Sequence, residues 1–293
     1  MTPLPDVLVE RVQDLAGPLT DAQAVGGGCI ANATRIEAGG ASYFLKWSGG
    51  DAGLTFEAEA AGLRALRAAG SPLFVPDVLA VENAEPPRPG FLLMDWITPG
   101  PKRSRFWSDF GASLAALHRH VSEDGCYGFG RDNFIGRLHQ YNGWEERWPD
   151  FFRRNRLNPQ IEWAREAGRW KQSWTEPADR LLARLDDLLP ASPPASILHG
   201  DLWSGNFLVT EDGRAALIDP AAYYGHRETD LALTELFGGF DARFYDAYRA
   251  AWALEPGYAE RREVYNLYHL LNHLNHFGGS YAAGVERTLK RFS

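Results

Sequence analysis

The pattern of apolar and polar positions divides the chain into a strand-rich beginning and a helix-rich remainder. Between residues 22 and 47, apolar and polar residues alternate around glycine-rich turns, which predicts a three-stranded antiparallel meander. Residues 6–16 have the spacing of a short amphipathic helix. Residues 53–69 are rich in Ala, Leu and Glu at helical spacing and predict a longer helix.

The pattern changes from strand-like to helix-like after two more predicted strands, at residues 74–83 and 91–97. The turn-rich segment AEPPRPG joins these two strands. Beyond Pro99 and Gly100 the chain is mainly helical in pattern. Helices are predicted at residues 104–120, 143–170 and 176–189 and over much of 229–289. We therefore predict an α+β protein, with a small sheet-containing lobe at residues 1–97 and a larger, mainly helical lobe at 98–293.

A polar loop interrupts two apolar stretches near residue 200. Asp201 and Asn206 share the segment HGDLWSGN, and the second stretch leads to Asp219, which chain reversal would bring beside Asn206. An aspartate and an asparagine supply hard oxygen ligands that suit Mg²⁺ bound together with phosphate. Asp201 is then free to accept a proton from an attacking hydroxyl, as phosphoryl transfer requires. Ordinary turn chemistry explains each residue singly but not their spacing.

Lysine is rare in this sequence, so a lysine in a predicted strand needs its own explanation. Four of the 30 Lys and Arg residues are Lys, and Lys46 ends the strand YFLK. Its charge suits nucleotide phosphates, with a carboxylate of the next helix as partner. Glu57 and Glu59 are the candidates, and Glu59 is preferred because it adjoins the apolar side of that helix. The alternative is a charge that protects an edge strand from aggregation.

Two other segments suit a nucleotide. In VGGGCIAN, between the first two predicted strands, Gly27 and Gly28 would let backbone amides approach phosphates, although such loops are also ordinary hairpin turns. Met94 lies in the stretch that joins the lobes and would border an adenine pocket, although a simple connecting strand has the same pattern. Cys29 is either a small loop residue or an oxidisable thiol, so the chain is expected to be a monomer or a redox-linked dimer.

The composition of the chain excludes several classes of partner and a disulfide-based fold. The 293 residues are 45% hydrophobic, which is enough for a sizeable core, and the net charge of −8 argues against nucleic acid or an anionic membrane as partner. The two cysteines, Cys29 and Cys126, are too few for a disulfide framework. The sequence shows no signal-peptide pattern at its start and no apolar run of membrane-spanning length, so we expect a cytoplasmic protein.

These motifs together resemble the protein-kinase-like superfamily, its aminoglycoside phosphotransferase and choline kinase branch, and most closely the fructosamine-3-kinase (ketosamine-3-kinase) family. The resemblance covers about residues 22 to 281 and rests on GGGCI, FEAEAAGL, QYNGWEERWPDFFRRNRLNPQ, HGDLWSGN, DPAAYYGHRETDLAL and LNHLNHFGGSY. It implies a bilobal protein-kinase-like fold. It also implies ATP- and Mg²⁺-dependent phosphorylation of the 3-hydroxyl of a ketosamine (fructosamine, ribulosamine or erythrulosamine, free or protein-bound), which serves deglycation repair.

The resemblance also implies roles for individual residues. Asp201 is the catalytic base, Asn206 and Asp219 are the Mg²⁺ ligands, and Lys46 holds the phosphates together with Glu59. The resemblance further implies that Asp95 and Ile97 contact adenine through their backbone groups. Asp230 would support the catalytic loop, and Trp203 would form part of a sugar-amine pocket. Position 200 is Gly where protein kinases have Arg, so control by activation-loop phosphorylation is not expected.

A separate segment of the chain suits the acceptor of the phosphoryl group. The aromatic- and amide-rich segment 140–160 suits a polyhydroxylated sugar, and we expect Asn142, Arg156 and Gln160 to contact it, although most of the segment also suits a helix core. An aminoglycoside, choline or another amino alcohol is the alternative acceptor, but an aminoglycoside site should be strongly acidic and this segment contains several Arg. A catalytically silent nucleotide-binding protein should lack the base, the Lys or a metal ligand.

Overall fold

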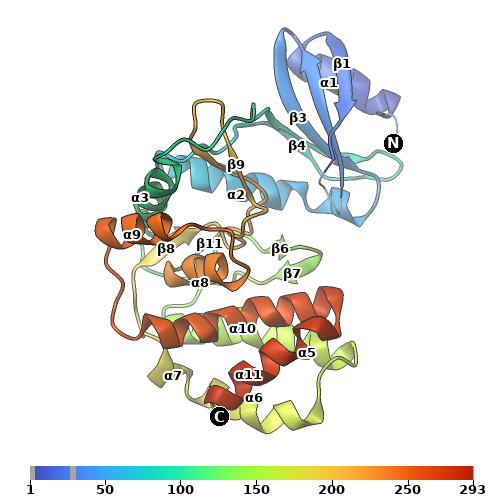
Figure 1. Cartoon of the computed structure of the whole chain (residues 1–293). Coiled ribbons are helices and arrows are strands. Elements are labelled where there is room, and N and C mark those ends of the chain that lie inside the picture. The colour runs from blue at the N-terminus through green and yellow to red at the C-terminus, as the bar shows by residue number, and fades with distance from the viewer. Residues whose placement is uncertain (1–3, 27–30, 293) are drawn as a thin grey trace.

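The computed structural model describes residues 4–26 and 31–292, and the chain folds into a small and a large lobe (Figure 1). The small lobe contains a five-stranded antiparallel sheet of order β1-β2-β3-β5-β4. Its elements are α1 (Asp6–Ala16), β1 (Leu19–Ala24), β2 (Asn32–Ala38), β3 (Ala41–Ser48), α2 (Phe56–Ala68), β4 (Val78–Glu82) and β5 (Gly90–Asp95). The predicted meander is confirmed as β1 to β3, and it begins three residues earlier than expected.

The sheet has two buried faces, which explains the unbroken apolar run of β5. Phe91 and Leu93 pack with Leu8 and Val12 of α1 on one face. Leu92 and Met94 face the other side and join the cluster that contains the apolar residues of α2. Alternate side chains of a strand point to opposite faces, so a strand buried on both sides is apolar throughout.

Helix α2 connects the sheet to the large lobe. Its buried side carries the apolar residues that predicted it, Phe56, Ala60, Leu63 and Leu66. Gly62 lies against the large lobe, where an added β-carbon would be 3.3 Å from the Ala222 side chain. The absence of a side chain at this position lets α2 approach the segment that follows Asp219.

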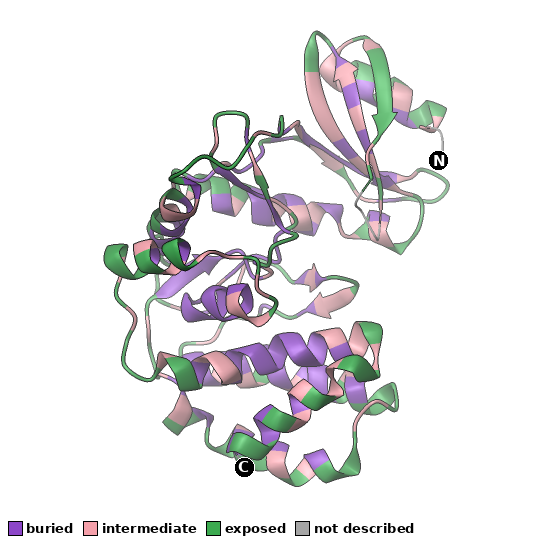
Figure 2. Cartoon of the chain, viewed as in Figure 1, coloured by how far each residue is buried: buried purple, intermediate pink, exposed green. Residues whose placement is uncertain are grey.

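The large lobe is mainly helical, as predicted. Its helices are α3 (Phe106–His118), α4 (Trp148–Phe152), α5 (Asn158–Glu166), α6 (Thr175–Ala183), α7 (Leu185–Leu188), α8 (Glu228–Leu236), α9 (Ala242–Ala251), α10 (Tyr258–Phe277) and α11 (Ala282–Phe292). One π-helical turn, Arg153–Leu157, joins α4 to α5. Helix α10 crosses the core of this lobe and is buried along most of its length (Figure 2).

Three two-stranded sheets lie in the large lobe: β6 (Asn133–Ile135) with β7 (Leu138–Gln140), β8 (Ala195–Leu198) with β11 (Tyr223–His226), and β9 (Phe207–Val209) with β10 (Ala215–Leu217). The sequence indicated two short strands around the polar loop. The structure differs, because the strand before the loop pairs with β11 and the strand after it pairs with β10. The polar loop therefore joins two separate sheets.

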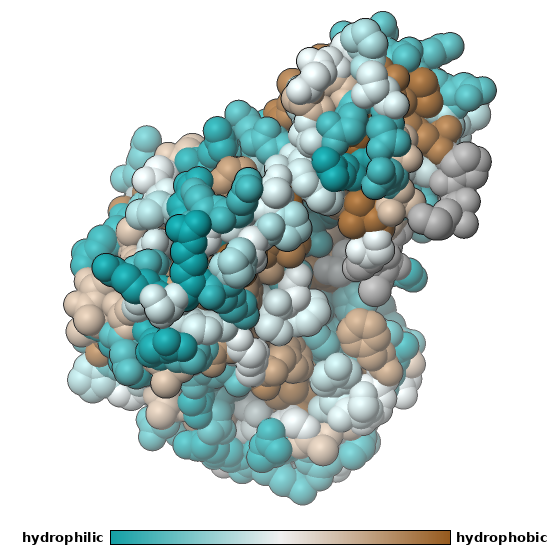
Figure 3. All heavy atoms as spheres, turned by 45° about the horizontal axis from the view of Figure 1, so that its top comes forward, coloured by the Kyte–Doolittle hydropathy of each residue, from teal (hydrophilic) through white to brown (hydrophobic). Residues whose placement is uncertain are grey.

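The space-filling view shows the two-lobed outline, with mainly hydrophilic side chains on the visible face (Figure 3). In the described part of the chain, every helix is too short or too polar to cross a lipid bilayer. The expected boundary between the lobes, after residue 97, stays a prediction.

Candidate active site

The polar loop is fixed by a buried carboxylate at the start of α8. The backbone N–H groups of His199 and Gly200 donate to the two carboxylate oxygens of Asp230 at 2.8 and 2.9 Å. His118 of α3 donates to the same carboxylate through Nε2 at 3.2 Å. Burial by itself would raise the pKa of Asp230, but these donors hold the pKa below its ordinary value. Asp230 is therefore an ionised anchor for the loop.

Gly200 is required by the shape of this loop. Its φ is +80°, and a β-carbon there would lie 2.0 Å from the Ala221 carbonyl oxygen. The neighbouring His199 donates through Nε2 to the Ile218 carbonyl at 2.9 Å, and its own carbonyl accepts from the Ala221 N–H at 2.9 Å. These contacts place the loop directly beside the segment that contains Asp219.

Asp201 projects from this loop as a partly buried carboxylate. Its Oδ2 accepts a hydrogen bond from Asn206 Nδ2 at 2.9 Å, and the same nitrogen donates to the Asp201 carbonyl at 2.8 Å. Burial raises the pKa of Asp201 to about 7, helped by the negative charges of Asp219 and Asp230 and opposed by the Asn206 hydrogen bond. A carboxylate with this pKa can accept a proton at neutral pH.

Asn206 and Asp219 meet as the sequence indicated. The Ile218 N–H donates to the Asn206 carbonyl at 3.1 Å, so Asp219 follows immediately beside it. Asp219 has a positive φ of 54°, which is rare for a residue with a side chain, and its side chain is 46% exposed. With the Asn206 amide nitrogen directed at Asp201, the amide oxygen and the Asp219 carboxylate remain as oxygen donors.

This pair fits Mg²⁺ carried by a phosphorylated ligand. Magnesium prefers oxygen donors and is usually held by one or two carboxylates together with substrate phosphates. Within the described ranges there is no cluster of three or more His, Cys, Asp or Glu side chains that could hold a metal ion. A metal at Asn206 and Asp219 would therefore take further oxygen ligands from the nucleotide.

Lys46 joins the two lobes at this site. It lies in β3 and forms ion pairs with Glu59 of α2, at 2.7 Å, and with Asp219 of the large lobe. Of the two candidate partners, Glu57 points elsewhere: it is 46% exposed and pairs with Arg131 at 3.4 Å. Burial alone would lower the pKa of Lys46, but Glu59 and Asp219 outweigh it and hold the pKa above its ordinary value. The ammonium group is therefore charged.

The segment between the lobes offers backbone groups at one of the expected positions. In the described part of the chain, the N–H and C=O groups of Ile97 have no hydrogen-bond partner, so both are available to a base. The Asp95 N–H is already used, because it donates to the Asp77 carbonyl at 3.0 Å. Met94 is 3% exposed within the core around α2. The adenine roles of all three stay predictions.

The glycine-rich loop is bounded as expected, but its centre is outside the described residues. Gly27, Gly28 and Cys29 all belong to this part, and their roles stay predictions. On its two sides, β1 and β2 pair antiparallel, and the Val25 N–H continues the ladder by donating to the Ala33 carbonyl at 2.9 Å.

Trp203 lies on the polar loop and is 40% exposed, which is unusual for so large an apolar side chain. Its ring covers Gly205, where an added β-carbon would be 2.2 Å from the ring. The tryptophan therefore presents an aromatic surface two residues from Asp201. Such a surface suits the apolar face of a sugar.

The three other residues expected to contact the substrate are in the interior. Asn142, Arg156 and Gln160 are each at most 1% exposed. Arg156 donates through Nη2 to Asn142 Oδ1 at 2.8 Å, and its guanidinium lies 3.9 Å from the centre of the Tyr223 ring. Gln160 Oε1 accepts from Asn275 at 2.8 Å. This placement differs from the direct contact that we expected, because these polar groups bind other parts of the protein.

Sequence reasoning missed a set of buried polar residues that support the segment after Asp219. Asn133 donates to the Ala222 carbonyl at 2.8 Å, and Gln140 donates to the Ala221 carbonyl at 3.0 Å. The Tyr268 hydroxyl in turn donates to Gln140 at 2.6 Å. These residues come from β6, β7 and α10, and no local motif indicates that they converge.

Comparisons with known proteins find relatives that match nearly the whole chain. The model of the fructosamine kinase family matches residues 5–293. A "probable ketoamine kinase" of Enterococcus faecium is 40% identical over 267 residues, which cover 91% of this chain and 93% of that protein. A "protein-ribulosamine 3-kinase, chloroplastic" of Oryza sativa subsp. indica is 36% identical, with 92% of this chain and 78% of that protein covered.

Solved structures are similar over nearly the whole chain. A candidate fructosamine-3-kinase from Thermobifida fusca has a TM-score of 0.87 at 32% identity, with 98% of each chain covered. An aminoglycoside phosphotransferase in a ternary complex with ADP and hygromycin B has a TM-score of 0.62 at 16% identity, with 97% of this chain and 96% of that chain covered. The second similarity concerns the fold alone, and it confirms the predicted bilobal α+β architecture.

Proposed function

This chain belongs to the fructosamine kinase family, and from that premise we propose that it transfers the γ-phosphoryl group of ATP to the 3-hydroxyl of a ketosamine. The acceptor is a fructosamine, ribulosamine or erythrulosamine on a free or protein-bound amine. Phosphorylation at this position makes the adduct unstable, so the sugar leaves and the amine is restored. The biological role is thus the repair of glycated amines.

One observation carries the proposal: Lys46 of the small lobe reaches Asp219 of the large lobe, beside Asp201. Phosphoryl transfer requires a cation, a metal-binding carboxylate and a base at one site. Here the small lobe supplies the cation, and the large lobe supplies the two carboxylates. The pKa of about 7 for Asp201 adds a proton acceptor that works near neutral pH.

Each group has a distinct task in this reaction. Asp201 orients the attacking hydroxyl and accepts its proton, while Lys46, oriented by Glu59, offsets charge on the phosphates. Mg²⁺, held by Asn206 and Asp219, would supply further positive charge to the phosphate oxygens. We assign the remaining nucleotide contacts to Gly27, Gly28, Met94, Asp95 and Ile97.

The acceptor side needs a revised assignment. Trp203 is exposed beside Asp201 and is the side chain best placed to stack on the sugar. Asn142, Arg156 and Gln160 are buried, and we assign them to support of the acceptor site. Arg156 lies against the ring of Tyr223, and this ring packs beside Gly200 of the polar loop, where an added β-carbon would be 3.3 Å from it. Because the reaction consumes ATP, we place the enzyme in the cytoplasm, as a monomer or as a dimer linked through Cys29.

A direct assay tests this function. The protein is incubated with Mg²⁺ and ATP and with fructosyl-lysine, ribulosyl-lysine, choline or kanamycin, and both ADP release and the phosphorylated product are measured. We expect turnover of the ketosamines and loss of that turnover in Asp201→Asn. Turnover of choline or kanamycin without turnover of either ketosamine would refute the proposed acceptor.

A further inference from the structure

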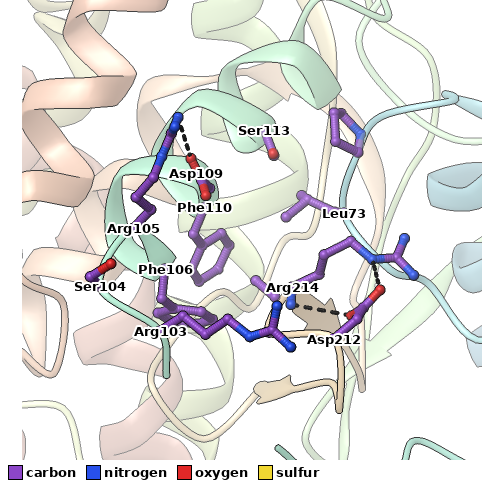
Figure 4. Close-up of a pocket in the computed structure, with 13 residues that line it drawn as sticks. Leu73, Arg103, Ser104, Arg105, Phe106, Asp109, Phe110, Ser113, Asp212 and Arg214 are labelled. Atoms are coloured by element: carbon purple, nitrogen blue, oxygen red, sulfur yellow. Dashed lines mark hydrogen bonds and ion pairs between the residues drawn. The ribbon is translucent and has the colours of Figure 1, made fainter. Parts of the chain in front are cut away.

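The segment that follows Asp219 is irregular, in contrast to the segment that precedes it. The preceding strands β9 and β10 form a hairpin, and its turn contains an ion pair between Arg214 and Asp212 at 2.7 Å (Figure 4). Residues 220–222 belong to no strand. Pro220 also lacks an N–H group that could donate to a neighbouring backbone. Other groups must therefore fix the position of this segment.

Asp219 needs such support because its backbone conformation is unfavourable. Among the described residues other than glycine, it is the one with a positive φ, at 54°. A strained conformation persists where the surrounding structure holds it in place. The contacts of the residues after Asp219 therefore decide how its carboxylate is presented to the active site.

Gln140 of β7 supplies one of these contacts. Its buried side chain donates through Nε2 to the Ala221 carbonyl at 3.0 Å and to Asn133 Oδ1 at 2.8 Å. Its Oε1 accepts from the Tyr268 hydroxyl at 2.6 Å. The opposite orientation of the amide would set its oxygen against the Ala221 carbonyl. The three bonds thus fix both the position and the orientation of the Gln140 amide.

Asn133 extends this support to the next carbonyl. Its Nδ2 donates to Ala222 at 2.8 Å, while its Oδ1 accepts from Gln140 and from Asn142 Nδ2, the latter at 3.0 Å. Asn142 Oδ1 accepts in turn from the fully buried Arg156 at 2.8 Å. The chain of bonds therefore begins at a buried guanidinium and ends on two consecutive backbone carbonyls. A charged donor strengthens the hydrogen bonds that are linked to it.

Ala221 is also bound to the loop that carries Asp201. Its N–H donates to the His199 carbonyl at 2.9 Å, and its carbonyl oxygen would be 2.0 Å from a β-carbon added at Gly200. Ala221 thus lies two positions after Asp219 and bonds to the residue two positions before Asp201. A shift of Ala221 would therefore move both carboxylates.

We propose that Gln140 is a positioning residue, which sets the spacing between Asp201 and Asp219 through the Ala221 carbonyl. It acts through the backbone, because its own side chain is buried. This inference rests on the proposed function, in which Asp201 is the base and Asp219 holds Mg²⁺. Outer groups that orient metal ligands contribute about tenfold to a hundredfold to metal affinity or activity. Loss of the Gln140 bonds should therefore weaken metal binding and slow phosphoryl transfer, while Lys46 is left unchanged.

The variant Gln140→Met tests the proposal, because methionine is similar in length but cannot donate to the Ala221 carbonyl. Two quantities are measured on the full chain: kcat for a ketosamine, and the affinity for Mn²⁺ in the presence of saturating ADP, by electron paramagnetic resonance. We expect kcat and Mn²⁺ affinity each to fall by about tenfold or more. The affinity for ADP without metal should stay the same.

Tyr268→Phe is a milder variant, which removes only the hydroxyl that supports Gln140. Tyr265→Phe is its matched control, because Tyr265 is buried in the same helix and its hydroxyl binds Trp148 and His226 instead. The two variants should lose a comparable amount of melting temperature. Only Tyr268→Phe should lower kcat and Mn²⁺ affinity, by about fivefold, since one neutral hydrogen bond is lost.

Unchanged kcat and Mn²⁺ affinity in a folded Gln140→Met would overturn the inference. If Gln140→Met does not fold, equal losses of kcat and Mn²⁺ affinity in Tyr268→Phe and Tyr265→Phe would overturn it. Absence of Mn²⁺ binding by the unmodified chain with ADP would do the same, because no metal would then depend on Asp219. Failure of the proposed function is a separate result: the unmodified chain would turn over no ketosamine, and the Mn²⁺ affinities of the variants would still test the inference.

Discussion

Asp201 combines two properties that oppose each other in most aspartates: it is partly buried, and it has to be ionised to act. Burial and the nearby carboxylates of Asp219 and Asp230 raise its pKa to about 7, while Asn206 stabilises the charged form. The surroundings of Asp201 thus set its pKa. Two independent measurements test this pKa: the pH dependence of activity and the pH dependence of the free energy of unfolding.

The pH dependence of activity should report this pKa. Because Asp201 must be deprotonated to accept a proton, kcat/KM for the ketosamine should rise through pH 7 and fall about tenfold per pH unit well below it. Asp201→Asn should lower kcat by roughly a thousandfold or more while ATP affinity is kept. Steady-state kinetics from pH 5 to 9 measure the first effect, and ATP titration of the variant measures the second. A flat profile in this range would contradict the assignment of Asp201 as base.

The same pKa shift should appear in the free energy of unfolding. The folded pKa of Asp201 lies above its ordinary value of 3.8, so the folded state holds a proton that the unfolded state releases between these two pH values. Its contribution to stability is present below pH 4 and is lost as the pH rises through about 7. Asp201→Asn should therefore be more stable than the unmodified chain at pH 8, by up to roughly 4 kcal/mol, with a smaller difference at pH 4.

Urea unfolding at both pH values measures this difference. Asp187→Asn, which removes an exposed carboxylate of α7, is the control for a general effect of lost negative charge. An equal gain in both variants at pH 8 would show that Asp201 is not the source of the effect.

At the residue scale, the convergence of the candidate reactive groups was predictable from the sequence, but the burial of their neighbours was not. Asp201, Asn206 and Asp219 follow a fixed spacing, so local pattern was sufficient to predict that they converge. The preference for Glu59 over Glu57 followed from one helix face and agrees with the ion pair to Lys46. We expected Arg156 to contact the sugar, yet it lies 3.9 Å from the Tyr223 ring centre in the interior. The pattern of one segment does not show which distant ring will cover an arginine.

At the element scale, the loop between β8 and β9 depends on a backbone conformation that a side chain would disturb. Gly200 combines a positive φ with close packing against the Ala221 carbonyl. Its two neighbours in the chain are His199, which bonds across the loop, and Asp201 itself. A change at position 200 should therefore affect both stability and catalysis.

Gly200→Ala should destabilise the protein by roughly 3 kcal/mol and lower kcat, because a β-carbon 2.0 Å from a carbonyl oxygen forces the loop to move. Gly125→Ala is the matched control: its φ is +73°, but nothing lies within 4 Å of the added atom. The control should lose about 1 kcal/mol from backbone strain alone and keep its kcat. Urea unfolding and steady-state kinetics of the two variants measure these effects. Equal losses in both would show that close packing at Gly200 is unimportant.

Element prediction succeeded where the pattern was local and failed where pairing was distant. The apolar spacing predicted the ends of α2 and α3 to within three residues. The pairing of β8 with β11 was missed, because two apolar strands near a common loop are indistinguishable from a hairpin in the sequence. Short strands such as β6 and β7 carry too few residues for a period of two to be recognised.

At the scale of the whole molecule, a charged contact at the site joins the two lobes. Lys46 comes from the sheet of the small lobe, and Asp219 comes from the large lobe. The substrates of a phosphoryl transfer must be brought together from both sides, so a cation that contacts both lobes also aligns them.

Lys46→Met should lower kcat/KM for ATP by roughly a hundredfold to a thousandfold, because the charge on the phosphates is no longer offset. Lys171→Met is a suitable control, since Lys171 forms an exposed ion pair with Glu286 at 2.9 Å in the large lobe. The control should leave kcat/KM unchanged. If Lys46→Met kept its kcat/KM for ATP, the assignment of this residue to the phosphates would be wrong.

The contact between Lys46 and Asp219 has a consequence for how metal and nucleotide depend on each other. In the proposed mechanism, phosphate oxygens that pair with Lys46 would leave the Asp219 carboxylate free to hold Mg²⁺. Nucleotide binding would then increase the affinity for the metal, and by thermodynamic reciprocity the metal would increase the affinity for the nucleotide by the same factor. The ion pair between Lys46 and Asp219 would thus make the binding of the two ligands mutually dependent.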